Sequence, residues 1–404
     1  MKLKTLDSID LKNKVILYRA PYDIDVKEVN GVLELTDDMR IRATVPSFQY
    51  LLKENCKIII LTYVGRPNGK VVENLRTGPH AKRLSELLNH PVDKVDDCIG
   101  GVVDDKISQM KEGGILMLEN VRFHPEEMVD DDNFAKELCK GKDILVFDGF
   151  PQAHRVHAST TGIERHLPSV AGLYLQHEVE MLSNLLENPA RPFTVIIGGA
   201  KVSDKVDAVN NLLNIADKVL VGGAVSNVFL KAEGKELGSS FMEDVFVDEK
   251  RREKKDWVVY AKEILEKYKD KVVLPEDVVI SDGVSSKVIE ISFDDVPDKW
   301  MALDIGPKTQ KDFSDIISKS KTVFLAGPMG KFEDEKFARG SKAILDAMKN
   351  PDIVSIIAGG DTIDVARKYS NLDDYSHVSL AGGATLEFLA GKELLALVPL
   401  MEKN

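Results

Sequence analysis

Short runs of apolar residues, many of them β-branched, alternate along the chain with longer amphipathic stretches. In the first half these runs are Val15–Tyr18, Ile58–Leu61, Ile115–Leu118 and Ile144–Phe147. In the second half they are Phe193–Ile197, Lys218–Val221, Val272–Leu274, Thr322–Ala326, Ile353–Ala358 and His377–Leu380. Continuous apolar runs separated by helices are typical of parallel strands that are covered on both faces. The sequence therefore predicts an α/β protein with doubly wound parallel sheets.

The amphipathic stretches between these runs predict helices, of which the clearest are Met39–Glu54, Asp204–Ala216, Val258–Tyr268 and Ala338–Met348. Ser203 is expected to cap the second of these helices. A further helical pattern, Ser169–Leu186, separates the two sets of strands and is followed by Asn-Pro and Arg-Pro steps, which disfavour further helix. We therefore expect one α/β domain over residues 1–168, a hinge helix over residues 169–187 and a second α/β domain over residues 188–389.

The composition narrows the classes of partner. With 43% hydrophobic residues and a net charge of −12, the chain can form extensive cores but has no basic arm. Nucleic acid and anionic membrane surfaces are therefore not expected as partners. No apolar run approaches the ~20 residues of a membrane-spanning helix, and the first residues show no signal-peptide pattern. We expect a cytoplasmic protein, and nothing in the sequence demands more than a monomer.

The three cysteines, Cys56, Cys98 and Cys139, are widely spaced and form no C-x-x-C motif. A disulfide framework or a zinc site is therefore not expected, and a reducing compartment suits this set. Each thiol is expected to be a small buried hydrophobe.

Glycines cluster directly after the predicted strands of the second half, at Gly198-Gly199, Gly222-Gly223, Gly327 with Gly330, Gly359-Gly360 and Gly382-Gly383. In open parallel sheets, ligands bind beyond the carboxyl ends of the strands. Glycine lets the backbone approach a ligand closely and presents N–H groups beside a positive helix terminus. A single glycine pair is common in turns. Glycine pairs after several successive strands predict a set of loops that bind a nucleotide.

The first of these loops reads GGAKVSDK, and the chain contains neither a Walker-type phosphate loop nor a G-x-G dinucleotide fingerprint. Lys201 and Lys205 lie one helical turn apart at a predicted helix start, which suits a polyphosphate, whereas the alternative is a solvated lysine pair. Asp361 directly follows Gly359-Gly360 and is predicted either to hold Mg²⁺ on the phosphates or to cap the next helix.

Arginines follow the predicted strands of the first half, at Arg40 and Arg42, Arg66, Arg122 and Arg155. The guanidinium fork suits phosphate and carboxylate. A single arginine is more often a surface ion-pair partner. The recurrence of arginines after several strands, however, predicts a small anion-binding basin. The acidic net charge of the chain does not reveal this basin.

His154 and His157 form an H-x-x-H pair beside Arg155, and a hydrogen-bonding role is expected there, not a metal site. Together these patterns predict one domain for a small anionic substrate and another for MgADP or MgATP. That pair of ligands implies phosphoryl transfer, with a domain closure that excludes water.

The chain resembles the phosphoglycerate kinase family from near its first residue to its last. The motifs that carry the resemblance are TDDMRIRATVPSFQYLL, VGRPNGK, LENVRFHPEE, DGFPQAHRVHAS, PFTVIIGGAKVSDK, LDIGP, AGPMGKFEDEKFARGSKAI, AGGDT and SHVSLAGGATLEFLAGKEL. The resemblance implies two Rossmann-like domains, the first for phosphoglycerate and the second for nucleotide, with the segment 390–404 returning to the first domain. It also implies the reversible transfer of the acyl phosphate of 1,3-bisphosphoglycerate to MgADP in glycolysis and gluconeogenesis.

By position in these motifs, the resemblance implies roles for individual residues. Arg40 and Lys201 would be catalytic. The phosphoglycerate would be bound by Asp23, Asp25, Arg40, Tyr63, Arg66, Arg122, His154 and Arg155. The nucleotide would be bound by Gly199, Lys201, Lys205, Gly222, Gly223, Ala302, Gly306, Pro307, Glu333, Gly359, Gly360, Asp361 and Thr362, with Asp361 on the Mg²⁺.

The chain departs from the family's motifs at several positions. The family's R-V-D-F/L-N-V-P is replaced by Arg19–Val26, and either direct alignment on Pro21 and Asp23 or a shift that places Asp23 and Asp25 on the Asp and Asn is possible. Tyr63 stands where the family has a histidine, and Ala326 where it has an asparagine. In the family's T-G-G-G-A, Leu380 and Ala381 replace the threonine and the first glycine.

These departures leave three functions open. The first is a divergent phosphoglycerate kinase. The second is a paralogous kinase of another phosphorylated carboxylic acid, and the third is a non-catalytic nucleotide-binding relative. The loss of one preorganised donor typically slows an enzyme ~10²–10³-fold.

Overall fold

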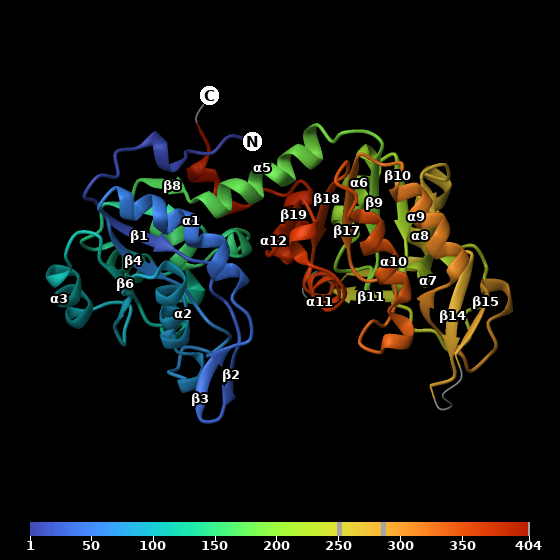
Figure 1. The fold of residues 1–404 in the computed structure, drawn as a ribbon, viewed down its shortest axis with the longest axis horizontal. Helices are drawn as coiled ribbons and strands as arrows, with labels where there is room; N and C mark the ends of the chain where they lie inside the picture. Colours follow the sequence, from blue (N-terminus) through green and yellow to red (C-terminus); the bar gives the residue numbers. More distant parts are fainter. Residues whose placement is uncertain (249–252, 284–287, 403–404) are drawn as a thin grey trace. The chain divides into compact units, whose positions relative to one another are not determined.

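The computed structural model describes residues 1–248, 253–283 and 288–402, and these form two compact units (Figure 1). Unit 1 comprises Met1–Met181 together with Glu393–Asn404, and unit 2 comprises Leu182–Lys392. The last two residues of the predicted C-terminal segment, 403–404, lie outside the described residues. The long helix α5 (Leu173–Glu187) begins in unit 1 and ends in unit 2.

Unit 1 is built on a parallel sheet of six strands in the order β5-β6-β4-β1-β7-β8. The strands are β1 (Val15–Arg19), β4 (Lys57–Leu61), β5 (Asp93–Lys94), β6 (Ile115–Met117), β7 (Ile144–Phe147) and β8 (Ser169–Ala171). The helices are α1 (Met39–Lys53), α2 (Gly78–Leu88), α3 (Gly101–Gln109) and α4 (Asp132–Cys139). All four residues of β7 and the last four of β1 and β4 are buried, as expected for strands covered on both faces.

Unit 2 contains a second parallel sheet of six strands in the order β13-β10-β9-β17-β18-β19. The strands are β9 (Phe193–Ile197), β10 (Lys218–Val221), β13 (Val272–Val273), β17 (Thr322–Ala326), β18 (Val354–Ala358) and β19 (His377–Ser379). Numbered within this sheet, the order is 3-2-1-4-5-6, which is that of dinucleotide-binding Rossmann domains. The predicted α/β class with two parallel sheets is confirmed.

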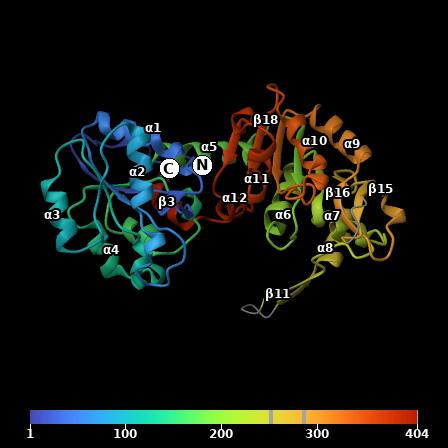
Figure 2. The same cartoon turned by 60° about the horizontal axis from the view of Figure 1, so that its bottom comes forward.

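Six helices surround the sheet of unit 2: α6 (Val206–Ile215), α7 (Gly223–Ala232), α8 (Trp257–Lys267), α9 (Pro307–Ile317), α10 (Arg339–Met348) and α11 (Gly360–Tyr369), followed by the short α12 (Gly383–Leu389). Helix α10 packs between α9 and α11, whereas α7 packs on α8 and α12 on α6 (Figure 1 and Figure 2). The order of strands in the sheet reverses between β9 and β17, so a ligand site is expected at their carboxyl ends.

Three smaller sheets were not predicted. In unit 1, β2 (Val26–Val29) and β3 (Val32–Leu35) form an antiparallel hairpin. In unit 2, β14 (Asp277–Ser281) lies between β15 (Ile289–Ser292) and β16 (Met301–Ile305), both antiparallel to it, and β11 (Val245–Asp248) pairs with β12 (Glu253–Asp256). The β14 sheet supplies one wall of a cavity described below.

Two predictions about helix ends are wrong. Ser169–Ala171 is not helical but forms the edge strand β8 beside β7, because its three residues are buried and complete the sheet. Helix α6 begins at Val206, so Ser203 is not its cap. The Ser203 hydroxyl and amide instead donate hydrogen bonds to the carboxylate of Glu243, at 2.6 and 2.8 Å.

The chain's two ends meet within unit 1. The amide of Lys4 donates to Leu400 O at 2.7 Å, that of Glu402 donates to Lys2 O at 3.1 Å, and Leu3 forms an antiparallel bridge with Met401. Farther in, the amide of Ala396 donates to Ala153 O at 3.2 Å. These bonds attach residues 396–402 to unit 1. Among the described residues, no helix has the length and apolar character needed to cross a membrane.

Candidate active site

The loops that follow β4 and β6 are joined at the carboxyl edge of the unit 1 sheet. Asn120 Nδ2 donates to Val64 O at 2.8 Å, and the Val121 amide donates to Thr62 O at 3.2 Å. The side chain of Asn120 also accepts from the Arg122 amide and so caps the short helix η3 (Val121–Phe123). Because parallel strands end at one edge, these bonds place Arg122 beside the loop that carries Tyr63.

Arg122 is buried against Tyr63. The Arg122 Cζ atom lies 3.4 Å from the centroid of the Tyr63 ring, and Nη1 donates to Gly65 O at 2.7 Å. Among the described residues, Nε and Nη2 of Arg122 have no hydrogen-bond partner although both atoms are buried. Buried donors without partners are costly, so two of them on one guanidinium indicate a site for an anion.

A second buried arginine, Arg19, ends β1 beside a buried carboxylate. Arg19 Nε donates to Ser159 O at 2.8 Å, and the amide and hydroxyl of Ser159 donate to Glu127 at 2.8 and 2.7 Å. Burial raises the pKa of Glu127, against the opposing effect of Arg19. No site role was predicted for Arg19, Glu127 or Ser159, and the available signal was a charged residue, Arg19, directly after an apolar strand run.

The pKa of His157 reflects the positive charge of the surrounding arginines. Burial and the charges of Arg122, Arg155 and Arg19 lower the pKa of His157 to about 4. Arg155 Nε and His157 Nδ1 are also buried without a hydrogen-bond partner within the described chain. Three arginines around one neutral histidine form a basin of unused donors. We call Arg19, Arg122, Arg155 and His157 the arginine basin.

Asp23 and Arg40 connect to this basin. The Gly65 amide donates to Asp23 Oδ1 at 2.8 Å, and Arg40 Nη1 donates to Asp23 O. A continuous chain of contacts thus runs from Arg40 through Asp23 and Gly65 to Arg122. Asp25, two residues on, is exposed at the start of the β2 hairpin.

The remaining predicted substrate residues are placed differently. Arg66 is exposed and His154 is half-buried, and their roles stay predictions. Arg42 is exposed and pairs with Asp38 at 2.8 Å on the surface of α1, so it is not part of the basin.

Unit 2 has a cavity of about 250 Å³ at the carboxyl ends of its strands. Its walls come from the loops after β9, β10 and β17, from β16 and from the first turn of α11. The cavity thus lies where the strand order reverses, as the sheet's topology requires. Predicted nucleotide residues in its lining are Gly199, Gly223, Ala302, Glu333 and Asp361. Residues that the sequence analysis missed include Asn227, Phe241, Phe293, Asp304 and Phe332.

The glycines of this region have two different functions. At Gly198, a Cβ atom would lie 2.2 Å from Pro328 O, and at Gly327 it would lie 2.3 Å from Gly198 O. These glycines allow the loops after β9 and β17 to pack backbone against backbone. At Gly360 and Gly383, by contrast, a Cβ atom would meet nothing within 4 Å. Open positions such as these, at the start of α11 and α12, leave room for a ligand to approach.

The two predicted phosphate lysines do not lie on a helix, because α6 begins after them. Lys201 is exposed, whereas burial lowers the pKa of Lys205 despite the nearby carboxylates of Asp204 and Asp361. The Lys205 Nζ lies 3.2 Å from the position of a Cβ atom on Gly199. Lys205 therefore points along the loop that enters the cavity, and its half-buried charge lacks a close ion pair among the described residues.

Asp361 is the second residue of α11 and lies exposed on the cavity wall. Gly359 occupies the cap position and no side chain caps this helix, so the alternative of Asp361 as a helix cap is wrong. A single exposed carboxylate suits Mg²⁺, which keeps most of its waters and binds phosphate oxygens at the same time. The donor present therefore fits a nucleotide-bound Mg²⁺.

Asp304 lies beneath the cavity and is 4% exposed. Burial raises its pKa to about 7, although its carboxylate accepts hydrogen bonds from the amides of Ile305 and Gly340 at 2.9 and 2.8 Å. Asp304 thereby ties α10 to β16 and holds the cavity wall in place.

The other predicted nucleotide residues do not line the cavity, and their roles stay predictions. These residues are Lys201, Lys205, Gly222, Gly306, Pro307, Gly359, Gly360 and Thr362. Thr362 is fully buried, and its hydroxyl accepts a hydrogen bond from the Gly327 amide at 2.7 Å. Gly306 packs on Asp277, whose carboxylate a Cβ atom would meet at 2.3 Å.

Comparison with known proteins gives a consistent result. A family model described as phosphoglycerate kinase matches residues 6–392. The solved phosphoglycerate kinase from Coxiella burnetii is 35% identical to this chain. The match covers 98% of each of the two chains, with a TM-score of 0.85. The solved phosphoglycerate kinase from Pyrococcus horikoshii is 31% identical to this chain. The match covers 98% of each of the two chains, with a TM-score of 0.84. The chain belongs to the phosphoglycerate kinase family.

Proposed function

We propose that this phosphotransferase moves the acyl phosphate of 1,3-bisphosphoglycerate to MgADP, reversibly, giving 3-phosphoglycerate and MgATP. The observation that carries the proposal is the set of buried N–H donors without partners in the described part of unit 1, on Arg19, Arg122 and Arg155. An anion with several oxygens satisfies donors that the described protein leaves unused. The phosphate of phosphoglycerate has this chemistry.

In the proposed substrate complex, Arg122 and Arg155 bind the non-transferring phosphate, with Arg66 closing over it from the exposed loop. Tyr63 holds the guanidinium of Arg122 in one plane by stacking on it, as the 3.4 Å distance indicates. Asp23 and Gly65 join Arg40 to the basin, and Arg40 would contact the carboxyl end of the substrate. Asp25 and His154 would contact the glycerate.

In unit 2, the nucleotide would occupy the cavity beside Glu333, with Asp361 as the protein ligand of the Mg²⁺. The bound ion would neutralise phosphate charge. Lys205 would contact the nucleotide phosphates, and Lys201 would neutralise the phosphoryl group in transfer. The open glycines Gly360 and Gly383 would present helix N-termini to phosphate oxygens.

During transfer, the bond between phosphorus and the carboxyl oxygen breaks, and a bond forms between phosphorus and a terminal oxygen of ADP. No protein group is bonded to the phosphoryl in this step, so catalysis rests on positioning and charge neutralisation. Arg40 stabilises the departing carboxylate. Because acyl phosphates hydrolyse, water must be excluded when the two ligands meet. We propose that the enzyme acts as a monomer in the cytoplasm.

The proposal is tested with purified protein, MgATP and 3-phosphoglycerate, by following ADP release in a coupled assay. Arg122→Met is expected to raise the KM for 3-phosphoglycerate at least ~10-fold, because a charge-assisted bond contributes ~1.5–3 kcal/mol. Arg42→Met is the matched control, since Arg42 is an exposed surface arginine, and its KM should equal that of the wild type. Nucleotide binding without turnover would refute the proposal.

A further inference from the structure

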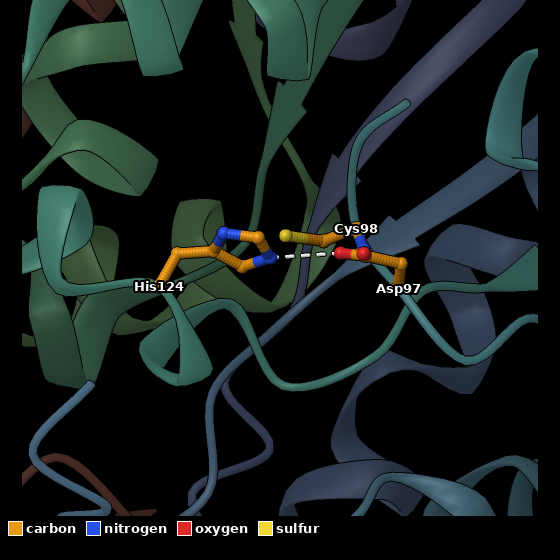
Figure 3. A group of neighbouring side chains, drawn as sticks. All are labelled: Asp97, Cys98 and His124. Atoms are coloured by element: carbon orange, nitrogen blue, oxygen red, sulfur yellow. Dashed lines mark hydrogen bonds and ion pairs between the residues drawn. The ribbon is translucent and has the colours of Figure 1, made fainter. Parts of the chain in front are cut away.

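Asp97, Cys98 and His124 bring one oxygen, one sulfur and one nitrogen ligand to a single point of unit 1. Asp97 and Cys98 lie in the loop between β5 and α3, and His124 lies between the short helices η3 and η4 (Pro125–Val129). The three ligand atoms lie within 4.8 Å of one another. Figure 3 shows the His124 ring facing both residues from the opposite segment.

These ligand types match those of zinc. Zn²⁺ binds thiolate sulfur, imidazole nitrogen and carboxylate oxygen in a tetrahedral arrangement, and many sites use three protein ligands with water in the fourth position. Around one ion such ligand atoms lie roughly 3.3–3.8 Å apart. Closure of the trio around an ion therefore needs side-chain movements on the order of 1 Å.

Contacts within the trio and outside it orient its side chains, and an ion would replace the hydrogen bond between His124 Nε2 and Asp97 Oδ1. Asp97 Oδ1 accepts hydrogen bonds from the Cys98 amide and from His124 Nε2, each at 2.7 Å. The Asp97 carbonyl accepts from the Glu119 amide at 3.2 Å, and the His124 ring packs on Phe134 with the ring centroids 5.2 Å apart. Ligands that are already oriented lose little freedom when an ion binds.

The trio is also open to solvent on one side. The side chain of Asp97 is 48% exposed and that of His124 is 28% exposed, whereas Cys98 is 1% exposed. An ion would therefore enter past the carboxylate and the imidazole and meet the sulfur at the base of the site.

A soft divalent cation is the ion that gains most from a sulfur ligand beside an imidazole and a carboxylate.

We propose that Asp97, Cys98 and His124 bind Zn²⁺ or a cation of similar softness, with water as the fourth ligand, at a site separate from the Mg²⁺ of the nucleotide. A zinc site was not predicted from the sequence, because the three cysteines are widely spaced and lack C-x-x-C spacing. The fold assembles the ligands instead from two segments that are distant in sequence. The ion would join the loop after β5 to the segment that carries Arg122 and Glu127.

Cobalt(II) is the probe that tests this site, because a thiolate ligand gives it a charge-transfer absorption band in the near ultraviolet. Nucleotide-free protein is titrated with Co²⁺ in excess Mg²⁺, which occupies hard oxygen sites. The wild type is expected to bind one Co²⁺ with this band, and Zn²⁺ should displace it. Absence of the band at saturating Co²⁺ would overturn the proposal.

Variants assign the band to the trio. Cys98→Ser should abolish it and weaken Co²⁺ binding at least ~10-fold. Cys139→Ser is the matched control, since Cys139 is a buried thiol on α4 that hydrogen-bonds Ile163 O, outside the trio. Should Cys98→Ser fail to fold, His124→Gln and Asp97→Asn replace partly exposed side chains and should weaken binding by a similar factor with an unchanged circular dichroism spectrum. A band that survives in Cys98→Ser, or unchanged affinity in both other variants, would refute the site.

Discussion

The guanidinium of Arg122 stacks on the ring of Tyr63, with 3.4 Å between Arg122 Cζ and the ring centroid. Tyr63 stands where the family's motif has a histidine, and its larger ring covers the face of the guanidinium. The stack leaves Nε and Nη2 of Arg122 directed away from protein acceptors in the described part of the chain. Tyr63 thus acts as a positioning residue for Arg122.

Removal of the ring tests this role. Tyr63→Ala is expected to raise the KM for 3-phosphoglycerate about 10-fold, because a desolvated cation–π contact contributes ~1–2 kcal/mol. Tyr63→Phe keeps the ring and should leave KM within about 2-fold of the wild type. Steady-state kinetics measure the KM of both variants, and thermal unfolding checks that each variant is folded. Equal KM values for the alanine variant and the wild type would contradict the role.

The buried carboxylate of Glu127 is expected to stabilise the basin in the absence of substrate. Glu127→Gln should lower the free energy of unfolding by about 2 kcal/mol, because the amide has only one acceptor oxygen for the two buried donors of Ser159 and leaves one of them without a partner. Urea denaturation measures the change. Glu126→Gln, on the same short helix but exposed, should change it by less than about 0.5 kcal/mol. Similar losses in both variants would show that the buried charge has no special role.

His157 is expected to respond to both pH and substrate. Its pKa is lowered to about 4 in the folded chain, whereas an unfolded histidine has a pKa of ~6.5. Between these values the unfolded chain binds more protons, so His157 makes the folded chain lose stability as the pH falls from about 6.5 toward 4. A bound phosphate stabilises the imidazolium and should raise the pKa of His157 by at least about 1.

NMR of the histidine side chains, assigned with His157→Gln, measures this pKa with and without 3-phosphoglycerate. Glycerol, which is uncharged, is the control ligand and should have no effect. A pKa of His157 that 3-phosphoglycerate leaves unchanged would place the substrate phosphate outside the arginine basin.

The start of α12 carries the two departures that follow β19. Leu380 is half-buried and Ala381 is 5% exposed, and Gly382, with φ +52°, opens the helix. Restoring the family's residues with Leu380→Thr and Ala381→Gly should raise kcat about 10- to 100-fold, because a hydroxyl and a mobile amide become available to the phosphoryl group. Each single variant should give part of the gain. No gain from the double variant would mean that this turn does not act in the transfer.

Much of the fold follows from local pattern. Phe193–Ile197 and Lys218–Val221 form strands with the predicted limits, because uninterrupted apolar runs of this length suit a strand buried on both faces. The edge strand β8 was mistaken for the start of α5, since a buried segment of three residues fits either structure. The β14 sheet was missed although four of the five residues of β14 are buried, because its neighbours β15 and β16 are partly exposed and carry no continuous apolar run.

The site could be predicted less completely. Arg40 and Arg42 look equivalent in sequence, but positions two apart face opposite sides of a helix, so Arg40 reaches Asp23 and Arg42 reaches only Asp38. The stack of Arg122 on Tyr63 joins residues whose contact depends on the order of β4 and β6 in the sheet. Lys201 and Lys205 were placed on a helix that begins only at Val206.

The proposed reaction, in the direction of ATP consumption, phosphorylates the carboxyl group of 3-phosphoglycerate. Hydroxylamine traps an acyl phosphate as a stable hydroxamate, so it detects that product directly. With MgATP and 3-phosphoglycerate, the wild type should form hydroxamate in proportion to ADP, and Lys201→Met should form it at least ~100-fold more slowly. Binding of MgATP and 3-phosphoglycerate without any hydroxamate would contradict the proposal.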